Sequence, residues 1–211
     1  MLDLFDNGPQ TLVEDAEGGI RYWAQFLPPA LAREWFQALR DGCRWQSARR
    51  PMYERVVDVP RLMAWYALGE VPEGLPLGLL LERVRAVAPG AYNSAGLNFY
   101  RDGNDSVAMH NDKLHQLVPG QPLALVSLGS VRRMNIRAKA GGRALGIELE
   151  PGSLLVMSHA SQLTHEHGIP KTARPVAPRM SVVFRARPQA ARTQDAWRAG
   201  APGPGPRERT A

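Results

Sequence analysis

Residue types suited to iron chemistry stand at three points of this chain and are followed by two arginines. The first three are His110, Asp112 and His167, and the arginines are Arg179 and Arg185. Two histidines and one carboxylate can occupy one face of an octahedral Fe(II) ion and leave the opposite positions open for a co-substrate and oxygen. The pattern therefore favours an iron-dependent oxygenase.

The spacing of these residues fits β-strands. On a strand, residues two apart project from the same face, so a strand through 110–112 would point His110 and Asp112 the same way. The segment 179–184 reads Arg-Met-Ser-Val-Val-Phe, is followed by Arg185, and is rich in β-branched and aromatic residues, as strands are. The two arginines are an even number of positions apart, so we expect both on one face.

A third predicted strand brings further polar groups to the same interior. Apolar and polar side chains alternate from Leu97 to Tyr100, which places Asn98 beside Tyr100 on one face. Inward guanidinium groups are costly to bury without an anion, because each stays charged and carries five donors. A dicarboxylate with a keto group could chelate iron at one end and accept a bidentate arginine bond at the other, assisted by the Tyr100 hydroxyl. 2-Oxoglutarate has this shape.

Six short motifs follow one another along some ninety residues. They are Asn98–Gly103, His110–Asp112, Pro122–Gly129, Glu150–Met157, His165–Pro170 and Pro178–Arg185. In this order they resemble the AlkB family of Fe(II)- and 2-oxoglutarate-dependent dioxygenases, and weaker similarity extends upstream through Val59–Arg61 to Trp65–Tyr66.

The resemblance implies a mainly β fold with flanking helices, a double-stranded β-helix or jelly roll, with the site inside it. It implies Fe(II) bound by His110, Asp112 and His167. It also implies 2-oxoglutarate, used together with O2, held by Asn98, Tyr100, Arg179 and Arg185. The activity that it implies is oxidative demethylation of alkylated bases in DNA or RNA, which makes nucleic acid the expected partner.

Three departures from the family pattern concern the co-substrate and the substrate. Lys113 and Leu114 follow the predicted iron-binding aspartate where many base-repair members carry further acidic residues. Ser181 replaces the asparagine of the family's Arg-x-Asn, and its shorter hydroxyl can bond the co-substrate less well. The segment 67–74 is short and non-aromatic where the family has an aromatic Tyr-x-Tyr-Ser-Gly type segment.

These departures leave the substrate open. Trp65 or Tyr66 could stack on a base extruded from a duplex. One alternative is a 2-oxoglutarate oxygenase that acts on a protein side chain or a small metabolite. Another, from a different class, is a metal-binding module without turnover.

The remaining histidines have structural interpretations. His165 would share a strand face with His167, and we expect it near the metal ligands or the substrate, while the family register selects His167 as the ligand. His115 and His159 are expected to be structural.

Length and periodicity predict one domain over residues 1–200, with a catalytic core at about 97–187 and a disordered Pro/Gly-rich tail at 201–211. Apolar residues recur at helical spacing in 29–41 and 77–87, which predicts two helices that brace the β core. Turn signals separate short β-rich runs at Pro119-Gly120, Gly141-Gly142 and Pro151-Gly152.

The composition predicts a soluble cytoplasmic protein that is attracted to a polyanion. No apolar run approaches the length of a membrane helix, and Cys43 is the single cysteine, which fits a reducing compartment. The formal charge is +6 and the pI is about 10.0, which favours nucleic acid, and no obligate protein partner is indicated. The basic residues concentrate in two segments, one with Arg49, Arg50, Arg55 and Arg61 and one with Arg132, Arg133, Arg137, Lys139 and Arg143.

Overall fold

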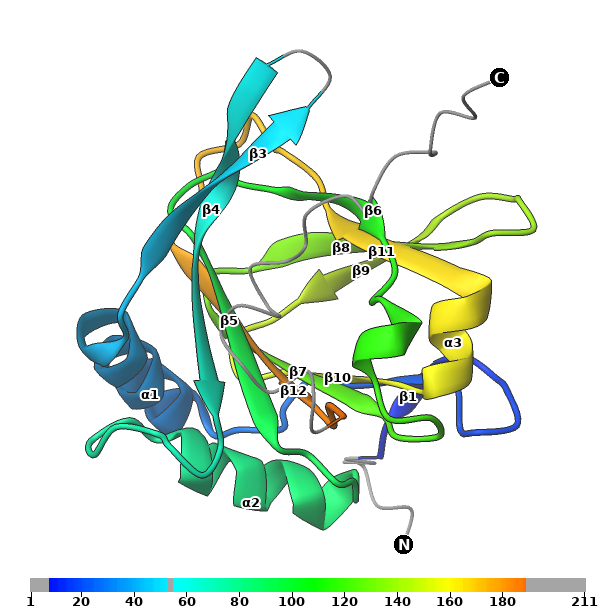
Figure 1. Ribbon diagram of the computed structural model, residues 1–211, viewed down its shortest axis with the longest axis horizontal. Coiled ribbons are helices and arrows are strands. Elements are labelled where there is room, and N and C mark those ends of the chain that lie inside the picture. Colours follow the sequence, from blue (N-terminus) through cyan, green and yellow to red (C-terminus); the bar gives the residue numbers. More distant parts are fainter. Residues whose placement is uncertain (1–7, 53–54, 189–211) are drawn as a thin grey trace, which may run out of the picture.

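Two antiparallel sheets face each other in the computed structural model, which describes residues 8–52 and 55–188 (Figure 1). The larger sheet has eight strands in the order β1-β2-β10-β7-β12-β5-β4-β3, and the smaller has four in the order β6-β11-β8-β9. This arrangement confirms the predicted jelly roll. The large-sheet strands are β1 (Gln10–Val13), β2 (Ile20–Trp23), β3 (Gln46–Met52), β4 (Arg55–Ala67), β5 (Ser94–Tyr100), β7 (Leu123–Gly129), β10 (Leu154–Met157) and β12 (Arg179–Arg185). The small-sheet strands are β6 (Val107–His110), β8 (Arg132–Ala138), β9 (Leu145–Leu149) and β11 (His165–Ile169).

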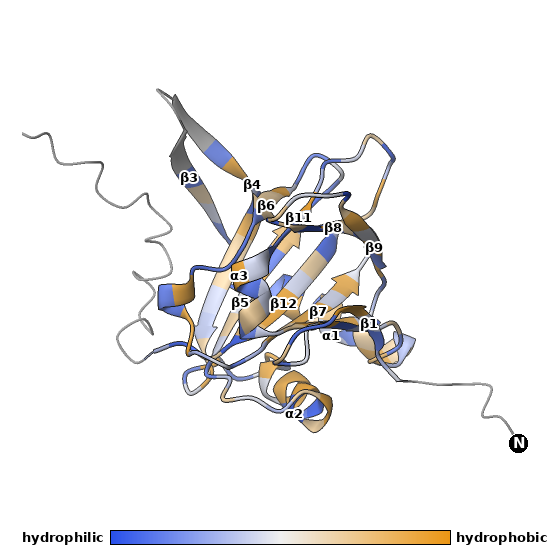
Figure 2. Cartoon of the chain, turned by 90° about the vertical axis from the view of Figure 1, so that its right-hand side faces the viewer, coloured by the Kyte–Doolittle hydropathy of each residue, from blue (hydrophilic) through white to orange (hydrophobic). Residues whose placement is uncertain are grey.

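The large sheet has an outer face that is covered by helices and an inner face that is turned to the small sheet. Because side chains alternate along a strand, β4, β5, β7 and β12 each contribute to both faces. Figure 2 shows the resulting alternation of hydrophobic and hydrophilic residues along the strands. The outer face carries Ala64, Tyr66, Ala95, Leu97, Ala124, Val126, Leu128, Met180, Val182 and Phe184, which form one buried cluster with the helices. The inner face carries Tyr100, Leu125, Leu155, Met157 and Val183, which cluster with Met134, Ile136, Ile147, Leu149 and Ile169 of the small sheet.

Both predicted helices are present. Helix α1 spans Pro29–Gly42, begins at the predicted proline and ends one residue beyond the predicted range, while α2 spans Leu77–Val87 as predicted. Their buried residues belong to the outer cluster, which confirms that the helices brace the β core: Ala32, Trp35, Leu39, Leu77, Leu80, Leu81 and Val84. None of the helices in the described ranges is both long and apolar enough to span a membrane.

The predicted turns are confirmed by glycines with positive φ. Gly120, Gly141, Gly142 and Gly152 have φ between 70° and 104°. At Gly152 a Cβ would lie 2.9 Å from the carbonyl oxygen of Leu27, so this turn requires glycine for both its conformation and its space. The predicted tail at 201–211 lies outside the described residues, as do the side chains of Arg50 and Arg55.

Candidate metal centre and its buried arginines

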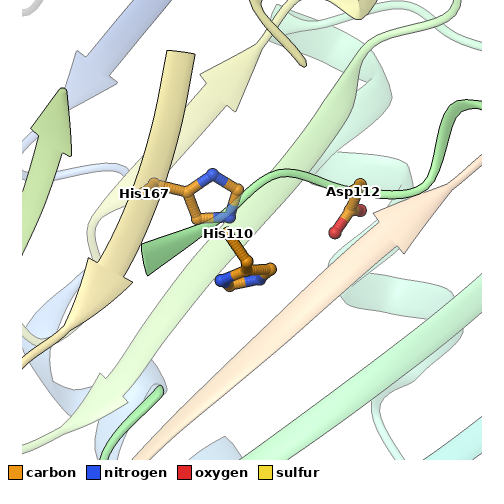
Figure 3. Close-up of side chains that lie close together, drawn as sticks. All are labelled: His110, Asp112 and His167. Atoms are coloured by element: carbon orange, nitrogen blue, oxygen red, sulfur yellow. The ribbon is translucent and has the colours of Figure 1, made fainter. Parts of the chain in front are cut away.

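The two predicted histidine ligands lie opposite each other on paired strands. His110 ends β6, His167 lies in the middle of β11, and the two are Cα partners in the antiparallel ladder. Their ring centroids are 4.5 Å apart. Ligand atoms of His110, Asp112 and His167 all lie within 4.8 Å of one another, and Figure 3 shows the three side chains turned to the same space. No other such group of His, Cys, Asp or Glu occurs in residues 8–52 and 55–188.

The prediction of a strand through residues 110–112 is wrong, because the strand ends before Asp112. Strand β6 stops at His110, so strand alternation does not orient Asp112. The main-chain N–H of Asp112 donates instead to Oε1 of Gln162, at 3.0 Å. The Asn111 side-chain amide donates to the Asp112 carbonyl oxygen, so local side chains replace the ladder after His110.

Charge and burial keep the three side chains ready to bind a cation. The Arg185 guanidinium donates to Asp112, and the two side chains are 15% and 12% exposed. Burial alone would raise the pKa of Asp112, but the adjacent Arg185 outweighs it and holds this pKa well below its usual range. Burial, together with the neighbouring His110, lowers the pKa of His167 to about 3. Asp112 is therefore ionised and His167 neutral at neutral pH, which are the forms that bind metal.

Arg179 is fully buried and incompletely bonded. Its Nε donates to Ser127 Oγ at 3.0 Å, and the guanidinium carbon lies 5.1 Å from the centre of the Tyr100 ring. Both terminal nitrogens are buried and have no hydrogen-bond partner among the described residues. Burial lowers the pKa of Arg179, which marks the cost of holding this charge away from water. Two unpaired donors in a dry interior fit one carboxylate that binds there in bidentate fashion.

The register of β5, β12 and β7 sets polar groups in two rows across the inner face. Asn98 and Ser127 are both partners of Ser181, and Tyr100 is the partner of Arg179 in the next row. Asn98 Oδ1 accepts a hydrogen bond from Arg61 Nε at 2.8 Å, so its amide nitrogen is the group that it can offer to a ligand.

Trp65 and Tyr66 face opposite sides of β4. Trp65 is the register partner of Gly96, which shares the inner face with Asn98, and its buried indole N–H has no partner in the described part of the chain. Tyr66 is 8% exposed in the outer cluster, and its hydroxyl accepts a hydrogen bond from the main-chain N–H of Arg44. The prediction that Tyr66 contacts the substrate is therefore wrong, since the large sheet separates it from the three metal-ligand residues.

The other histidines are not part of the cluster. His165 is half-buried at the start of β11, and its Nδ1 is hydrogen-bonded to Thr164 Oγ1 at 2.9 Å. His159 begins the short helix α3 (His159–Thr164), and His115 is exposed in the 3-10 helix η1 (Leu114–Gln116). Geometry and family register thus select the same second histidine.

The prediction of a basic surface is wrong in part. Arg132 is 3% exposed and donates to three main-chain carbonyl oxygens, those of Asp102, Asp105 and Pro170. Such an arginine stabilises two loops and does not face a polyanion. Arg137 is exposed but pairs with Glu166 at 3.0 Å.

Two buried residues near these groups were not predicted from the sequence. Ser127 is the one hydroxyl in the buried run of β7, and a lone serine between apolar residues was the available signal. Arg187 lies an even number of positions after Arg185, is 6% exposed and donates to Gln116 Oε1 at 3.3 Å. Burial lowers its pKa to about 10.

The jelly roll brings two histidines and an aspartate together beside a buried arginine whose terminal nitrogens have no partner among the described residues. This combination defines a class of oxygenase, and the comparison with known proteins agrees. The model of the 2OG-Fe(II) oxygenase superfamily matches residues 19–193. Human "DNA oxidative demethylase ALKBH2" is 30% identical over 201 residues, which cover 84% of this chain and 77% of that protein. The bovine protein of the same name is 32% identical over 179 residues, covering 74% and 64%. Mouse "Alpha-ketoglutarate-dependent dioxygenase alkB homolog 3" is 33% identical over 148 residues, covering 60% and 51%, so the chain spans less than two thirds of these last two relatives.

The chain therefore belongs to the AlkB family of 2-oxoglutarate-dependent dioxygenases. The cofactor of this class is Fe(II), and its co-substrates are 2-oxoglutarate and O2. The donor set of two imidazoles and one carboxylate suits Fe(II), and the unpaired nitrogens of Arg179 suit a carboxylate of 2-oxoglutarate, so the residues present fit both groups.

Proposed function

We propose that this protein removes methyl groups from alkylated bases in DNA or RNA. One observation carries the proposal: the three metal-ligand residues and a buried, unpaired guanidinium occur together in a chain 30% identical to human DNA oxidative demethylase ALKBH2. The proposed iron ligands are His110, Asp112 and His167. The proposed 2-oxoglutarate-binding residues are Asn98, Tyr100, Arg179 and Arg185.

When bound, Fe(II) with 2-oxoglutarate and O2 supplies the oxidation of an N-methyl carbon. In the overall reaction the N-methyl base, 2-oxoglutarate and O2 give the N–H base, formaldehyde, succinate and carbon dioxide. One oxygen atom of O2 ends in formaldehyde and the other in succinate, and the base nitrogen receives a proton when its bond to the methyl carbon breaks.

The residues of the chain bind, orient and exclude water in this proposal. The terminal nitrogens of Arg179 donate to the distal carboxylate of 2-oxoglutarate, and Ser127 holds the third nitrogen of the same guanidinium. Arg185 keeps Asp112 ionised. Binding thus satisfies donors that are otherwise buried without acceptors, and the co-substrate is placed before the methyl group arrives.

Trp65 is the proposed substrate contact that faces the inner side of the sheet. An extruded base can stack on its ring, which offsets part of the cost of leaving the helix stack. The formal charge of +6 adds a general attraction to phosphate.

One observation favours a second candidate, oxidation of a protein side chain or a small metabolite. In the segment 67–74, Leu68 and Val71 pack against the outer cluster, and the Leu68 N–H donates to the Asn93 carbonyl oxygen at 3.0 Å. This segment therefore does not extend over the site, where an aromatic clamp on a base would be needed.

The test is an assay with purified protein, Fe(II), 2-oxoglutarate and single-stranded oligonucleotides that carry 1-methyladenine or 3-methylcytosine. We expect formaldehyde release and conversion of the methylated base, while the Asp112→Ala protein gives neither product. Succinate formation without any loss of the methyl group would contradict a nucleic-acid substrate and favour the second candidate. The same oligonucleotides without methyl groups serve as the control.

A further inference from the structure

The strand that carries His110 ends before Asp112, so something other than the β-ladder must hold the aspartate. We propose that Gln162 is a positioning residue of the metal centre, which fixes the main chain of Asp112 relative to His167. The proposal rests on the hydrogen bond from the Asp112 N–H to Gln162 Oε1, at 3.0 Å, which joins residues 50 positions apart in sequence. This inference rests on the proposed role of Asp112 and His167 as metal ligands.

The orientation of the Gln162 amide is fixed by its own contacts. The residue is 1% exposed, and Nε2 donates to Ser161 Oγ at 3.2 Å and toward the sulfur of Met157 at 3.8 Å. With both hydrogens of Nε2 engaged, Oε1 is the atom left to accept from Asp112. Every polar atom of this buried side chain is thus used, as a buried amide requires.

The contact is the end of a buried hydrogen-bond network that crosses helix α3. Ser161 Oγ donates to the Ser158 carbonyl oxygen at 2.7 Å, and the Ser161 N–H donates to Ser158 Oγ at 2.9 Å. Ser158 Oγ in turn donates to Asp15 Oδ2 at 2.5 Å, and Ser158, Ser161 and Gln162 are all at most 3% exposed. Fully satisfied networks of this kind are rigid, because no member can turn without leaving a partner unpaired.

The same helix leads directly into the strand of the second histidine. Helix α3 ends at Thr164 and β11, which carries His167, begins at His165. On the other side, Lys139 Nζ donates to the Gln162 carbonyl oxygen at 2.9 Å, which ties α3 to the chain that follows β8. Gln162 therefore links the segment of His167 to the segment of Asp112, so that ligands from two distant parts of the chain keep one spacing.

A residue in this place acts on metal affinity through ligand geometry. Partners that orient metal ligands typically contribute about 10–100-fold in affinity. We expect the Gln162→Met protein, which keeps the side-chain length and loses the acceptor, to bind Co(II) about 10–100-fold more weakly than wild type. The Gln162→Glu protein keeps an acceptor oxygen for the Asp112 N–H but loses the Nε2 donors to Ser161 and Met157, so it is expected to bind Co(II) more tightly than Gln162→Met and more weakly than wild type.

The experiment titrates each purified protein with Co(II) and follows the visible absorption, which reports affinity and coordination geometry together. Leu163→Met, on the same helix at a side chain that is 54% exposed, is the matched control and should bind as wild type does. Equal Co(II) affinity for Gln162→Met and wild type would overturn the inference, as would weaker binding by Gln162→Glu than by Gln162→Met. If Gln162→Met does not fold, Gln162→Leu, which also lacks the acceptor, takes its place, and Co(II) affinity equal to wild type would overturn the inference.

A double-mutant cycle with Asp112→Ala separates positioning from general structural damage. If Gln162 acts through Asp112, Gln162→Met has no further effect on Co(II) affinity in the Asp112→Ala background. Equal losses in both backgrounds would contradict the inference. If Asp112→Ala alone leaves Co(II) affinity unchanged, the proposed metal centre itself fails, which is a different outcome from the failure of Gln162 alone.

Discussion

The outer and inner faces of the large sheet are built from the same strands and differ in composition, because the outer face is an apolar cluster and the inner face combines apolar with charged side chains. On β12, the outward residues Met180, Val182 and Phe184 are buried in the helix-covered cluster. The inward residues of that strand include Arg179 and Arg185, which lie beside Tyr100 and Asp112. Alternation along one strand thus assigns stability to one face and chemistry to the other.

Substitutions on the two faces should therefore have separable effects. Apolar burial on the outer face stabilises the fold in proportion to the area removed from water. Charges on the inner face cost free energy to bury and are useful only when an anion and a metal meet them. Outer-face variants should lose stability, and inner-face variants should lose ligand binding.

The largest expected effect is on the outer face. Phe184 is fully buried, and Phe184→Ala should lower the free energy of unfolding by about 3–5 kcal/mol through lost burial and the cavity that remains. Urea denaturation of the apo protein measures this change. The KM for 2-oxoglutarate of the folded fraction should stay at the wild-type value, and a parallel increase in KM would show that the two faces are coupled.

A comparable effect on the inner face should appear in binding. Arg179→Met removes the donors proposed for the distal carboxylate, and losing such a charge-assisted pair costs about 2–5 kcal/mol. Calorimetry should therefore show 2-oxoglutarate binding weakened by roughly 30-fold or more. The free energy of unfolding of the apo protein should not fall, because the variant no longer buries an uncompensated charge. Unchanged 2-oxoglutarate affinity would remove Arg179 from the site.

Trp65 and Tyr66 are neighbours on β4 and allow a direct comparison of the two faces, with smaller expected effects. Trp65→Ala should raise the KM for a methylated oligonucleotide by about fivefold or more, since stacking on a base contributes about 1–3 kcal/mol. Tyr66→Phe removes the hydrogen bond to the Arg44 N–H and should lower the free energy of unfolding by about 1 kcal/mol. Steady-state kinetics of both proteins give the KM, and urea denaturation gives the free energy of unfolding. A change in KM from Tyr66→Phe would contradict its assignment to the outer face.

The last expected effect is a pH dependence of the outer cluster. Burial raises the pKa of the Cys43 thiol from 9.0 to about 11, and the hydrogen bond with Tyr66 only partly opposes this. Between about pH 9 and 11 the unfolded chain has lost this proton and the folded protein keeps it. The free energy of unfolding should therefore fall as the pH rises through this window, and Cys43→Ala should reduce that slope.

Labelling of Cys43 gives an independent measurement. Two pKa units leave about 100-fold less thiolate in the folded protein, so iodoacetamide at pH 8 should label it far more slowly than the urea-unfolded chain. Equal rates would contradict the burial of this thiol.

Local patterns were sufficient to predict much of the fold. The predicted strand at 179–184 is present and extends to Arg185, and 77–87 is a helix as the periodicity predicted, because each pattern is a property of adjacent residues. The convergence of the two histidines and the aspartate also follows the prediction. The single domain over 1–200, the cytoplasmic location and the lack of an obligate protein partner stay predictions.

The predictions failed mainly where a contact with a residue distant in sequence determines the local structure. Strand β6 ends at His110, and Asp112 is held by Gln162, a residue 50 positions away that no local pattern connects to it. Arg132 looked like surface charge, but its acceptors are carbonyl oxygens on two separate loops. The resemblance to the family pointed to both Trp65 and Tyr66, but neighbouring residues on a strand face opposite sides of the sheet.

The most direct test of the inner face is an anaerobic titration with Fe(II) and 2-oxoglutarate, followed by visible absorption. When 2-oxoglutarate chelates Fe(II) in a protein site, a charge-transfer band appears that neither component gives alone. We expect this band in the wild-type protein, no band in Asp112→Ala, and a band that needs roughly 30-fold or more 2-oxoglutarate in Arg179→Met. Absence of the band from folded wild-type protein at saturating Fe(II) and 2-oxoglutarate would contradict the assignment of this site to Fe(II) and 2-oxoglutarate.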